Sequence, residues 1–231
     1  MKKMIKVLLS SIFCLSTLAG CSSSPYTKAE AQTLTIQGVP VYVEPDEETT
    51  QEDIDTFLKA IKAQPEFLKK NCTGIHLQGE NAFINYAQQN FGDKYNKTFG
   101  YTIGEDVFLK TNLNVNGSKR DIDSVKDTVA HELWHVFDYA NGNDEYYLSE
   151  FDFNILYNQN PGSISEYGAT NVLEFFAEAG TMYLLSPEEL KEKNMDVCIV
   201  CGRNRCQPAM AGVRVSKSRK NVAKYGCGCR M

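Results

Sequence analysis

The sequence is almost devoid of histidine: its 231 residues include three, His76, His131 and His135. The last two lie four residues apart, and two imidazoles do not complete a metal site, so a third ligand must come from elsewhere. The chain also lacks an excess of positive charge. Its formal net charge of −5 argues against nucleic acid as the main partner. No internal repeat is visible, and the length suits one globular domain with appendages.

The amino-terminal apolar run, from Val7 to Leu18, is too short to cross a bilayer as a mature helix. It follows a lysine-rich start, which is the order of features in a secretion signal. Its end, Leu18-Ala19-Gly20-Cys21, resembles the lipobox of bacterial lipoproteins. We therefore expect a signal peptide over residues 1–20, a lipid on Cys21 and a tether over residues 21–32. This places the protein on the outer face of the bacterial cell membrane. The alternative is an ordinary signal peptide followed by an incidental cysteine.

The carboxy-terminal segment, residues 191–231, differs in composition from the rest of the chain. It contains ten Lys or Arg and two Asp or Glu, a net charge of +8. It also holds five of the eight cysteines: Cys198, Cys201, Cys206, Cys227 and Cys229. Together with Cys72, these could form disulfides or hold a structural zinc. Because neither a helical nor a strand period runs through the segment, we expect an unstructured or aberrant tail after a domain of residues 33–190.

Within that domain, strand patterns precede two strongly apolar helices. The strand patterns lie at residues 33–44, 73–79 and 101–117, with shorter helical patterns after the first two. One long helix includes residues 127–142, with Asp121 or Asp123 as its N-cap and Gly142 just beyond its end. A second helix covers residues 170–186. There Asn171 is the expected N-cap, and Glu174 should accept reciprocally from its backbone. This order predicts an α+β domain, a small sheet packed on the helices.

The first of these helices carries the sequence His131-Glu132-Leu133-Trp134-His135. Residues four apart share a helical face, so the two imidazoles can present nitrogens to one ion. Glu132 directly follows His131 on the helix, so it is close enough to reach a metal-bound water without binding the metal. This H-E-x-x-H spacing is typical of zinc hydrolases, in which the glutamate takes a proton from the water.

The candidates for the third metal ligand can be reduced by elimination. The metzincin pattern needs a glycine and a third histidine at positions held here by Asp138 and Asn141. His76 lies on an expected strand, where a structural histidine is the simpler interpretation. The second apolar helix instead offers Glu174 and Glu178, again four apart and flanked by apolar residues. Buried carboxylates need partners, and a zinc ion for one and a histidine N–H for the other would satisfy both.

At this point "HELWH" followed by "SEYGATNVLEFFAEA" resembles the anthrax toxin lethal factor-like zinc metallopeptidases, a family that includes the clostridial Pro-Pro endopeptidases. The resemblance implies a zincin-like fold with an active-site helix and a second ligand-bearing helix. It implies Zn²⁺ bound by His131, His135 and Glu174, with Glu132 as the general base. It further implies that Tyr167 stabilises the oxyanion and that Glu178 orients a ligating histidine.

Two features depart from that family. Pro-Pro endopeptidases have an acidic residue where this chain has Leu173, which argues against Pro-Pro cleavage. The cysteine-rich tail also replaces the apolar terminal helix that the family would have. Large toxin delivery domains are absent, so a translocated toxin is not expected.

The sequence thus predicts a monomeric zinc endopeptidase that hydrolyses extracellular or surface proteins or peptides. The alternative from another class is a lipid-anchored binding protein in which the zinc site is structural or inactive. A third interpretation is the inactive product of a damaged gene.

Overall fold

The structure is a computed structural model that describes residues 28–92, 98–115, 117–143, 146–206 and 227–230. The expected signal peptide, the lipidation site at Cys21 and most of the tether lie outside these residues. Among the described residues, no helix is both long enough and apolar enough to cross a membrane.

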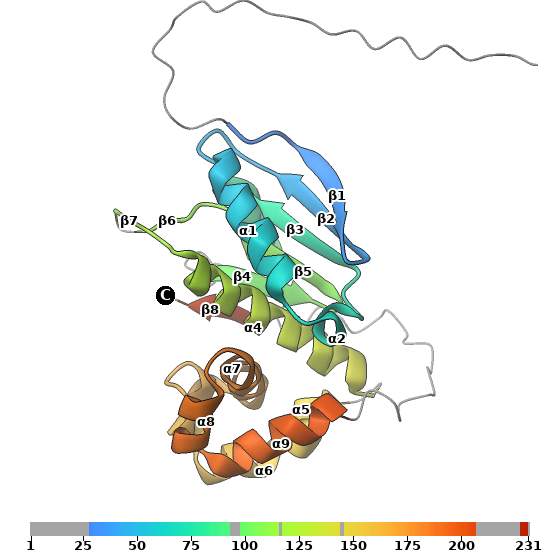
Figure 1. The fold of residues 1–231 in the computed structure, drawn as a ribbon, viewed down its shortest axis with the longest axis vertical. Coiled ribbons are helices and arrows are strands. Elements are labelled where there is room, and N and C mark those ends of the chain that lie inside the picture. Colours follow the sequence, from blue (N-terminus) through green and yellow to red (C-terminus); the bar gives the residue numbers. More distant parts are fainter. Residues whose placement is uncertain (1–27, 93–97, 116, 144–145, 207–226, 231) are drawn as a thin grey trace, which may run out of the picture.

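A mixed six-stranded sheet forms one half of the molecule (Figure 1), with the strand order β1-β2-β3-β5-β4-β8. The strands β2, β3 and β5 run parallel to one another, whereas β1, β4 and β8 are antiparallel to their neighbours. Their bounds are β1 Gln32–Ile36, β2 Val39–Glu44, β3 Gly74–Gln78, β4 Thr98–Ile103, β5 Asp106–Lys110 and β8 Cys227–Arg230. A separate small hairpin joins β6 (Asn114–Val115) to β7 (Ser118–Lys119).

The first expected strand pattern, residues 33–44, forms a hairpin of β1 and β2. Its two-residue turn is Gln37-Gly38, with φ of 49° and 88°. Positive φ at both central positions gives a turn whose twist matches that of the strands, and glycine adopts it without strain.

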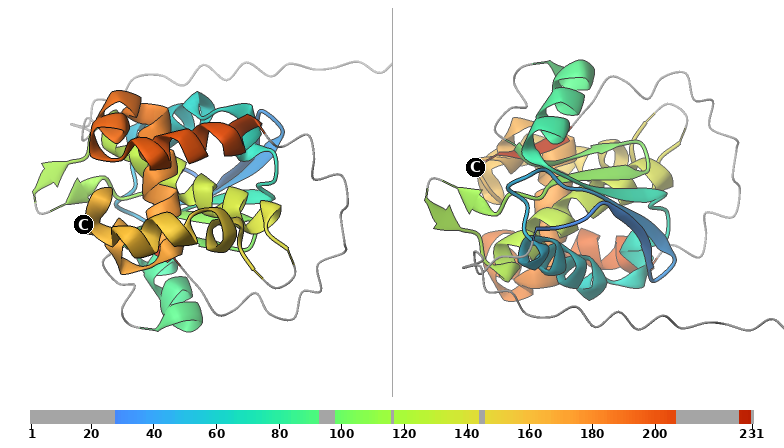
Figure 2. Two further views of the ribbon diagram at one scale, coloured as in Figure 1. Left: turned by 90° about the horizontal axis from the view of Figure 1, so that it is seen from below. Right: turned by 90° about the horizontal axis from the view of Figure 1, so that it is seen from above.

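Helices cover both faces of the sheet (Figure 2). On one face, α1 (Gln51–Ala63) and α4 (Ile122–Asn141) bury the alternate strand residues Val41, Ile75 and Leu109 in the main core. On the other face, α3 (Glu80–Phe91) packs Phe83 against Tyr101, forming a smaller core. The sheet is therefore buried on both sides near its centre, as a sheet with parallel strands requires.

The ends of the helices follow local chemistry. Thr50 caps α1 through a capping box with Asp53, and the helix stops before Pro65, where the short α2 (Glu66–Lys69) begins. For α4 the N-cap is Asp121, whose side chain accepts from Ser124 N. At its other end, a Cβ on Gly142 would lie 2.4 Å from the Tyr146 carbonyl oxygen, so only glycine permits the turn there.

Helix α4 divides the molecule, with the sheet on one side and a helical half on the other (Figure 1). The helical half contains α5 (Leu148–Asp152), α6 (Asn154–Gln159), α7 (Val172–Leu185), α8 (Pro187–Lys193) and α9 (Met195–Cys206), with two 3₁₀ turns, η2 (Pro161–Ser163) and η3 (Gly168–Thr170). Helix α7 packs directly on α4. At the contact, a Cβ on Gly180 would lie 2.5 Å from the Trp134 ring.

The α+β architecture is confirmed, but the expected boundary at residue 190 is not observed. Helix α9 continues the fold to Cys206, and Val197, Cys198 and Cys201 are buried in the main core. Its start is fixed by Asn194, whose side chain accepts from Val197 N and donates to Ser163 Oγ. The expectation of an unstructured tail is therefore wrong for residues 191–206, because a few apolar positions suffice when neighbouring helices cover them. Three of the cysteines considered for disulfides or zinc (Cys72, Cys198 and Cys201) are free and buried.

Replacing Gly180 by alanine should lower the free energy of unfolding by about 1–3 kcal/mol, because the new methyl overlaps the Trp134 ring. Gly202→Ala in α9 is the matched control, since its Cβ would meet nothing closer than 3.4 Å. Alanine is the better helix former, so this control should be neutral or slightly stabilising. Urea unfolding of both variants tests the pair, and equal stabilities would show that the α4–α7 approach is not tight at Gly180.

Candidate metal centre

Two histidines on adjacent turns of α4 form the base of the site. His131 and His135 are 2% and 5% exposed, and their Nε2 atoms lie 3.0 Å apart. The helix holds them in place because Val129, Leu133 and Val136 anchor its other faces in the main core. Both rings consequently present a nitrogen to one point between α4 and α7.

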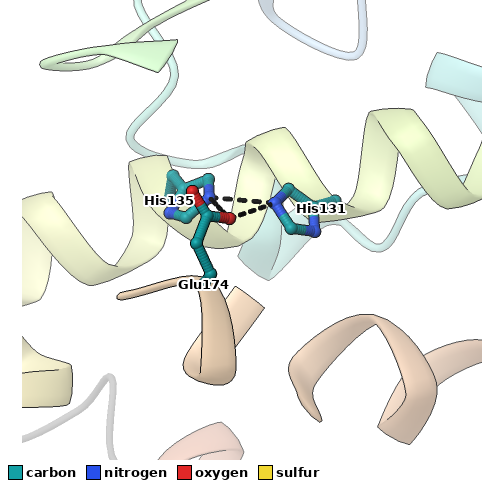
Figure 3. Close-up of side chains that lie close together, drawn as sticks. All are labelled: His131, His135 and Glu174. Carbon is teal, nitrogen blue, oxygen red and sulfur yellow. Dashed lines mark hydrogen bonds and ion pairs between the residues drawn. The ribbon is translucent and has the colours of Figure 1, made fainter. Parts of the chain in front are cut away.

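Glu174 reaches that point from α7 (Figure 3). Its Oε2 lies 3.0 Å from His131 Nε2 and 3.3 Å from His135 Nε2. The expected N-cap of α7 is confirmed, because Asn171 Oδ1 accepts from the backbone N–H groups of Leu173 and Glu174. The reciprocal capping bond expected from the Glu174 side chain is not formed, since its carboxylate is turned to the histidines instead.

The triangle of Nε2, Nε2 and Oε2 fits a zinc ion. Tetrahedral zinc with bonds of about 2.0–2.1 Å separates its ligand atoms by about 3.3 Å. The three distances here, 3.0, 3.0 and 3.3 Å, are close to that value. Three protein ligands also leave one tetrahedral position for a water or a substrate oxygen, as in catalytic rather than structural zinc sites.

A second carboxylate fixes the orientation of one ligand. Glu178 Oε1 lies 2.9 Å from His131 Nδ1, so that nitrogen carries the proton and Nε2 keeps its lone pair for a metal. Ser165 Oγ donates to Glu178 Oε2 at 2.7 Å and accepts from Gly168 N at 2.8 Å. The sequence predicted Glu178, but Ser165 was missed, because a serine nine residues before the ligand has no distinguishing signal.

The electrostatics of the site favour ionised carboxylates at these two positions. Burial would raise the pKa of Glu174, but the adjacent imidazoles His135 and His131 hold that pKa far below its usual range. The pKa of Glu178 is also lowered despite burial, chiefly by its hydrogen bond to His131. The anionic oxygen of Glu174 and the two imidazole nitrogens that face it make a binding site for a cation.

Glu132 lies on the same helix but faces the sheet. It is fully buried, and Thr102 of β4 donates to its Oε2 at 2.8 Å. A Cβ on Gly100 of β4 would lie 2.8 Å from Glu132 Cγ, so this glycine is needed for the close approach. Burial raises the pKa of Glu132 even though the two histidines oppose the shift. Among the described residues, its Oε1 is buried without a hydrogen-bond partner.

The structure places the two remaining candidates from the sequence, Tyr167 and His76, in different environments. Tyr167, half-buried just before η3, places its ring 5.7 Å from that of His131, beside the candidate metal centre. His76 lies on β3, stacked between Tyr42 and Phe108 with centroid distances of 4.8 and 4.5 Å. The interpretation of His76 as a structural residue is confirmed.

A pair of buried hydrogen bonds next to the site was not predicted from the sequence. Asp138, one turn after His135, accepts from both Ser149 N and Ser149 Oγ at 2.7 Å. These bonds tie the end of α4 to the start of α5. Burial raises the pKa of Asp138 to about 7, although the bonds from Ser149 oppose the shift.

No protein family model matches the sequence, and no curated protein matches it significantly. Among solved structures, the fold is similar to that of the Pro-Pro endopeptidase PPEP-2 from Paenibacillus alvei. The sequence identity is 16%, the TM-score is 0.48, and the match covers 70% of this chain and 96% of that chain.

The purified chain should contain about one chelator-removable zinc, and Glu174→Gln should abolish most of this binding, since it removes an anionic ligand. Glu178→Gln should weaken zinc binding about 10–100-fold, as loss of a histidine-orienting partner typically does. Metal analysis and competition with a chromophoric chelator measure both effects. Glu166→Gln, an exposed acid beside Tyr167, is the control. Undiminished zinc in Glu174→Gln would exclude this ligand set.

Asp138 should make the metal-free protein less stable as the pH rises. Its folded pKa of about 7 lies above the ordinary value, so the stabilising protonated form is complete below about pH 4 and is lost as the pH rises towards 7. Asp138→Asn keeps similar hydrogen bonds without this titration. As the pH rises from 5 to 8, the free energy of unfolding of this variant should increase relative to that of wild type by on the order of a few kcal/mol. Urea unfolding with chelator, using exposed Glu192→Gln as control, measures the difference, and parallel pH profiles would contradict it.

Proposed function

We propose that this protein is a zinc-dependent endopeptidase of the zincin type. The observation that carries the proposal is the pairing of a three-ligand centre with a separate glutamate. His131, His135 and Glu174 converge at distances suited to zinc, while the adjacent Glu132 keeps one carboxylate oxygen without a partner. A structural zinc site would be closed by a fourth protein ligand instead.

When bound, Zn²⁺ would supply Lewis acidity, which lowers the pKa of a water molecule towards about 7 and polarises a scissile carbonyl. The protein residues do the remaining work. Glu132 accepts a proton from the attacking water and passes it to the leaving amine, and its raised pKa suits it to both transfers. Thr102 holds one of its oxygens, which leaves the other to handle the proton. The phenol of Tyr167 donates a hydrogen bond to the negative charge that develops on the substrate oxygen.

The proposed setting is the outer face of the bacterial cell membrane. The basic and apolar start of the chain and the lipobox-like residues before Cys21 support a lipid anchor there. Proteins or peptides at that surface are the proposed substrates, and the protein acts as a monomer. Leu173, in place of an acidic residue before Glu174, argues against a Pro-Pro preference.

The burial of the centre favours a second candidate, a binding protein with a structural zinc. Glu132, His131, Glu174 and His135 are at most 5% exposed. Such a protein would hold zinc and cleave nothing, whatever residue stands at position 132.

Glu132→Gln should lower kcat/KM for a peptide substrate by at least about a thousandfold, because the amide cannot accept the proton from water. Zinc content should stay at the wild-type level, since Glu132 is not a ligand. Mass spectrometry of an exported-protein peptide library identifies the substrate and measures the loss. A variant that keeps both zinc and wild-type cleavage would eliminate the proposed base.

Tyr167→Phe should lower kcat about 10²–10³-fold, which is the typical loss when one oxyanion donor is removed. Because the phenyl ring is retained, KM and zinc content should change little. The measurement is steady-state kinetics on the substrate found for wild type, with Tyr183→Phe, on the far part of α7, as a tyrosine control. Equal kcat values for Tyr167→Phe and wild type would remove this residue from the mechanism.

A further inference from the structure

The last described segment of the chain returns to the sheet beside the candidate metal centre. Strand β8 pairs antiparallel with β4, matching Tyr101 with Gly228 and Thr102 with Cys227. The same strand also contacts α4, the helix that carries the histidines. Figure 1 shows β8 along the margin of β4, next to α4.

The partner strand β4 is the one that touches Glu132. Its residue Gly100 lies against the Glu132 side chain, and Thr102 donates a hydrogen bond to the Glu132 carboxylate. A segment that pairs with β4 and also contacts α4 therefore runs next to the proposed catalytic base. The low exposure of the centre agrees with this, because Glu132 is fully buried in this state.

Strand β4 would otherwise form an edge of the sheet. In the order β5-β4-β8, removal of β8 leaves the outer N–H and C=O groups of β4 unpaired. An extended peptide binds such an edge through main-chain hydrogen bonds. Its backbone would then lie beside Glu132 and within reach of the centre formed by His131, His135 and Glu174.

We propose that β8 is a self-inhibitory strand that occupies the edge of β4 in place of a peptide substrate, so that cleavage requires its displacement. This inference rests on the proposed peptidase function. The strand is only four residues long and lies at the margin of the sheet, so it is held by few hydrogen bonds and can be displaced. Because β8 competes from within the same chain, it raises the apparent KM and leaves kcat nearly unchanged.

A matched pair of substitutions in β8 tests the inference in the full zinc-loaded chain. Gly228→Pro places a proline, which cannot donate a hydrogen bond, opposite Tyr101 and should release β8. Gly228→Ala keeps the N–H and should behave like wild type. A chain that ends at residue 226 lacks β8 altogether and should match the proline variant. Native hydrogen exchange of residues 98–103 reports pairing without any activity, and the central strand β3 reports that the fold is intact.

We expect residues 98–103 to exchange at least about tenfold faster in Gly228→Pro and in the shortened chain than in wild type. An added peptide with the sequence of residues 224–231 should restore protection to the shortened chain. Cleavage of the peptide library by Gly228→Pro should rise at least about tenfold in kcat/KM, through a lower KM.

Two results would overturn the self-inhibitory strand. Equal exchange in all forms would show that β8 does not pair with β4 in solution. Faster exchange with unchanged kcat/KM would show that β8 pairs there but blocks nothing. Failure of the peptidase proposal looks different, because no form of the chain would then cleave any peptide, and the inhibitory role would fall with it.

Discussion

The burial of the Glu174 carboxylate is the constraint on which the rest of the structure depends. A carboxylate that is 3% exposed is costly unless opposite charge or hydrogen-bond donors surround it. Here the two histidines of α4 meet it, which requires α4 and α7 to approach closely. Gly180 permits that approach by leaving room for the Trp134 ring. The close packing of α4 on α7 therefore also brings the histidines to the buried Glu174 carboxylate.

The three residues that hydrogen-bond to the acids around the centre come from different parts of the fold. Ser165, before η3, donates a hydrogen bond to Glu178, and Thr102 of β4 donates one to Glu132. Ser149 of α5 holds Asp138 at the end of α4. Because the centre lies between the sheet and the helical half, its geometry depends on both halves packing correctly on α4. Strand β4, which pairs with β8, is also in direct contact with Glu132 through Thr102.

Much of the local structure could be predicted because it rests on local rules. The first hairpin, the end of α1 before Pro65 and the N-cap Asn171 each follow from a few neighbouring residues. The segment between α4 and α7 gave no comparable signal, although it forms α5, α6 and two 3₁₀ turns. Helix α9 was missed for a related reason. Its buried residues are few, and Asn194 fixes its start through a contact with Ser163, far away in the sequence.

The sequence by itself determined the pair of histidines four residues apart, the glutamate between them and the pair of carboxylates on a second apolar helix. Helical periodicity fixes these relations, since residues four apart must share a face. Only the tertiary structure decided that Glu174 meets both imidazoles while Glu178 meets the far side of one, and that His76 stands in an aromatic stack. It also decided that β8 lies along β4. Those outcomes depend on how helices and strands pack across long distances in sequence, which local spacing does not encode.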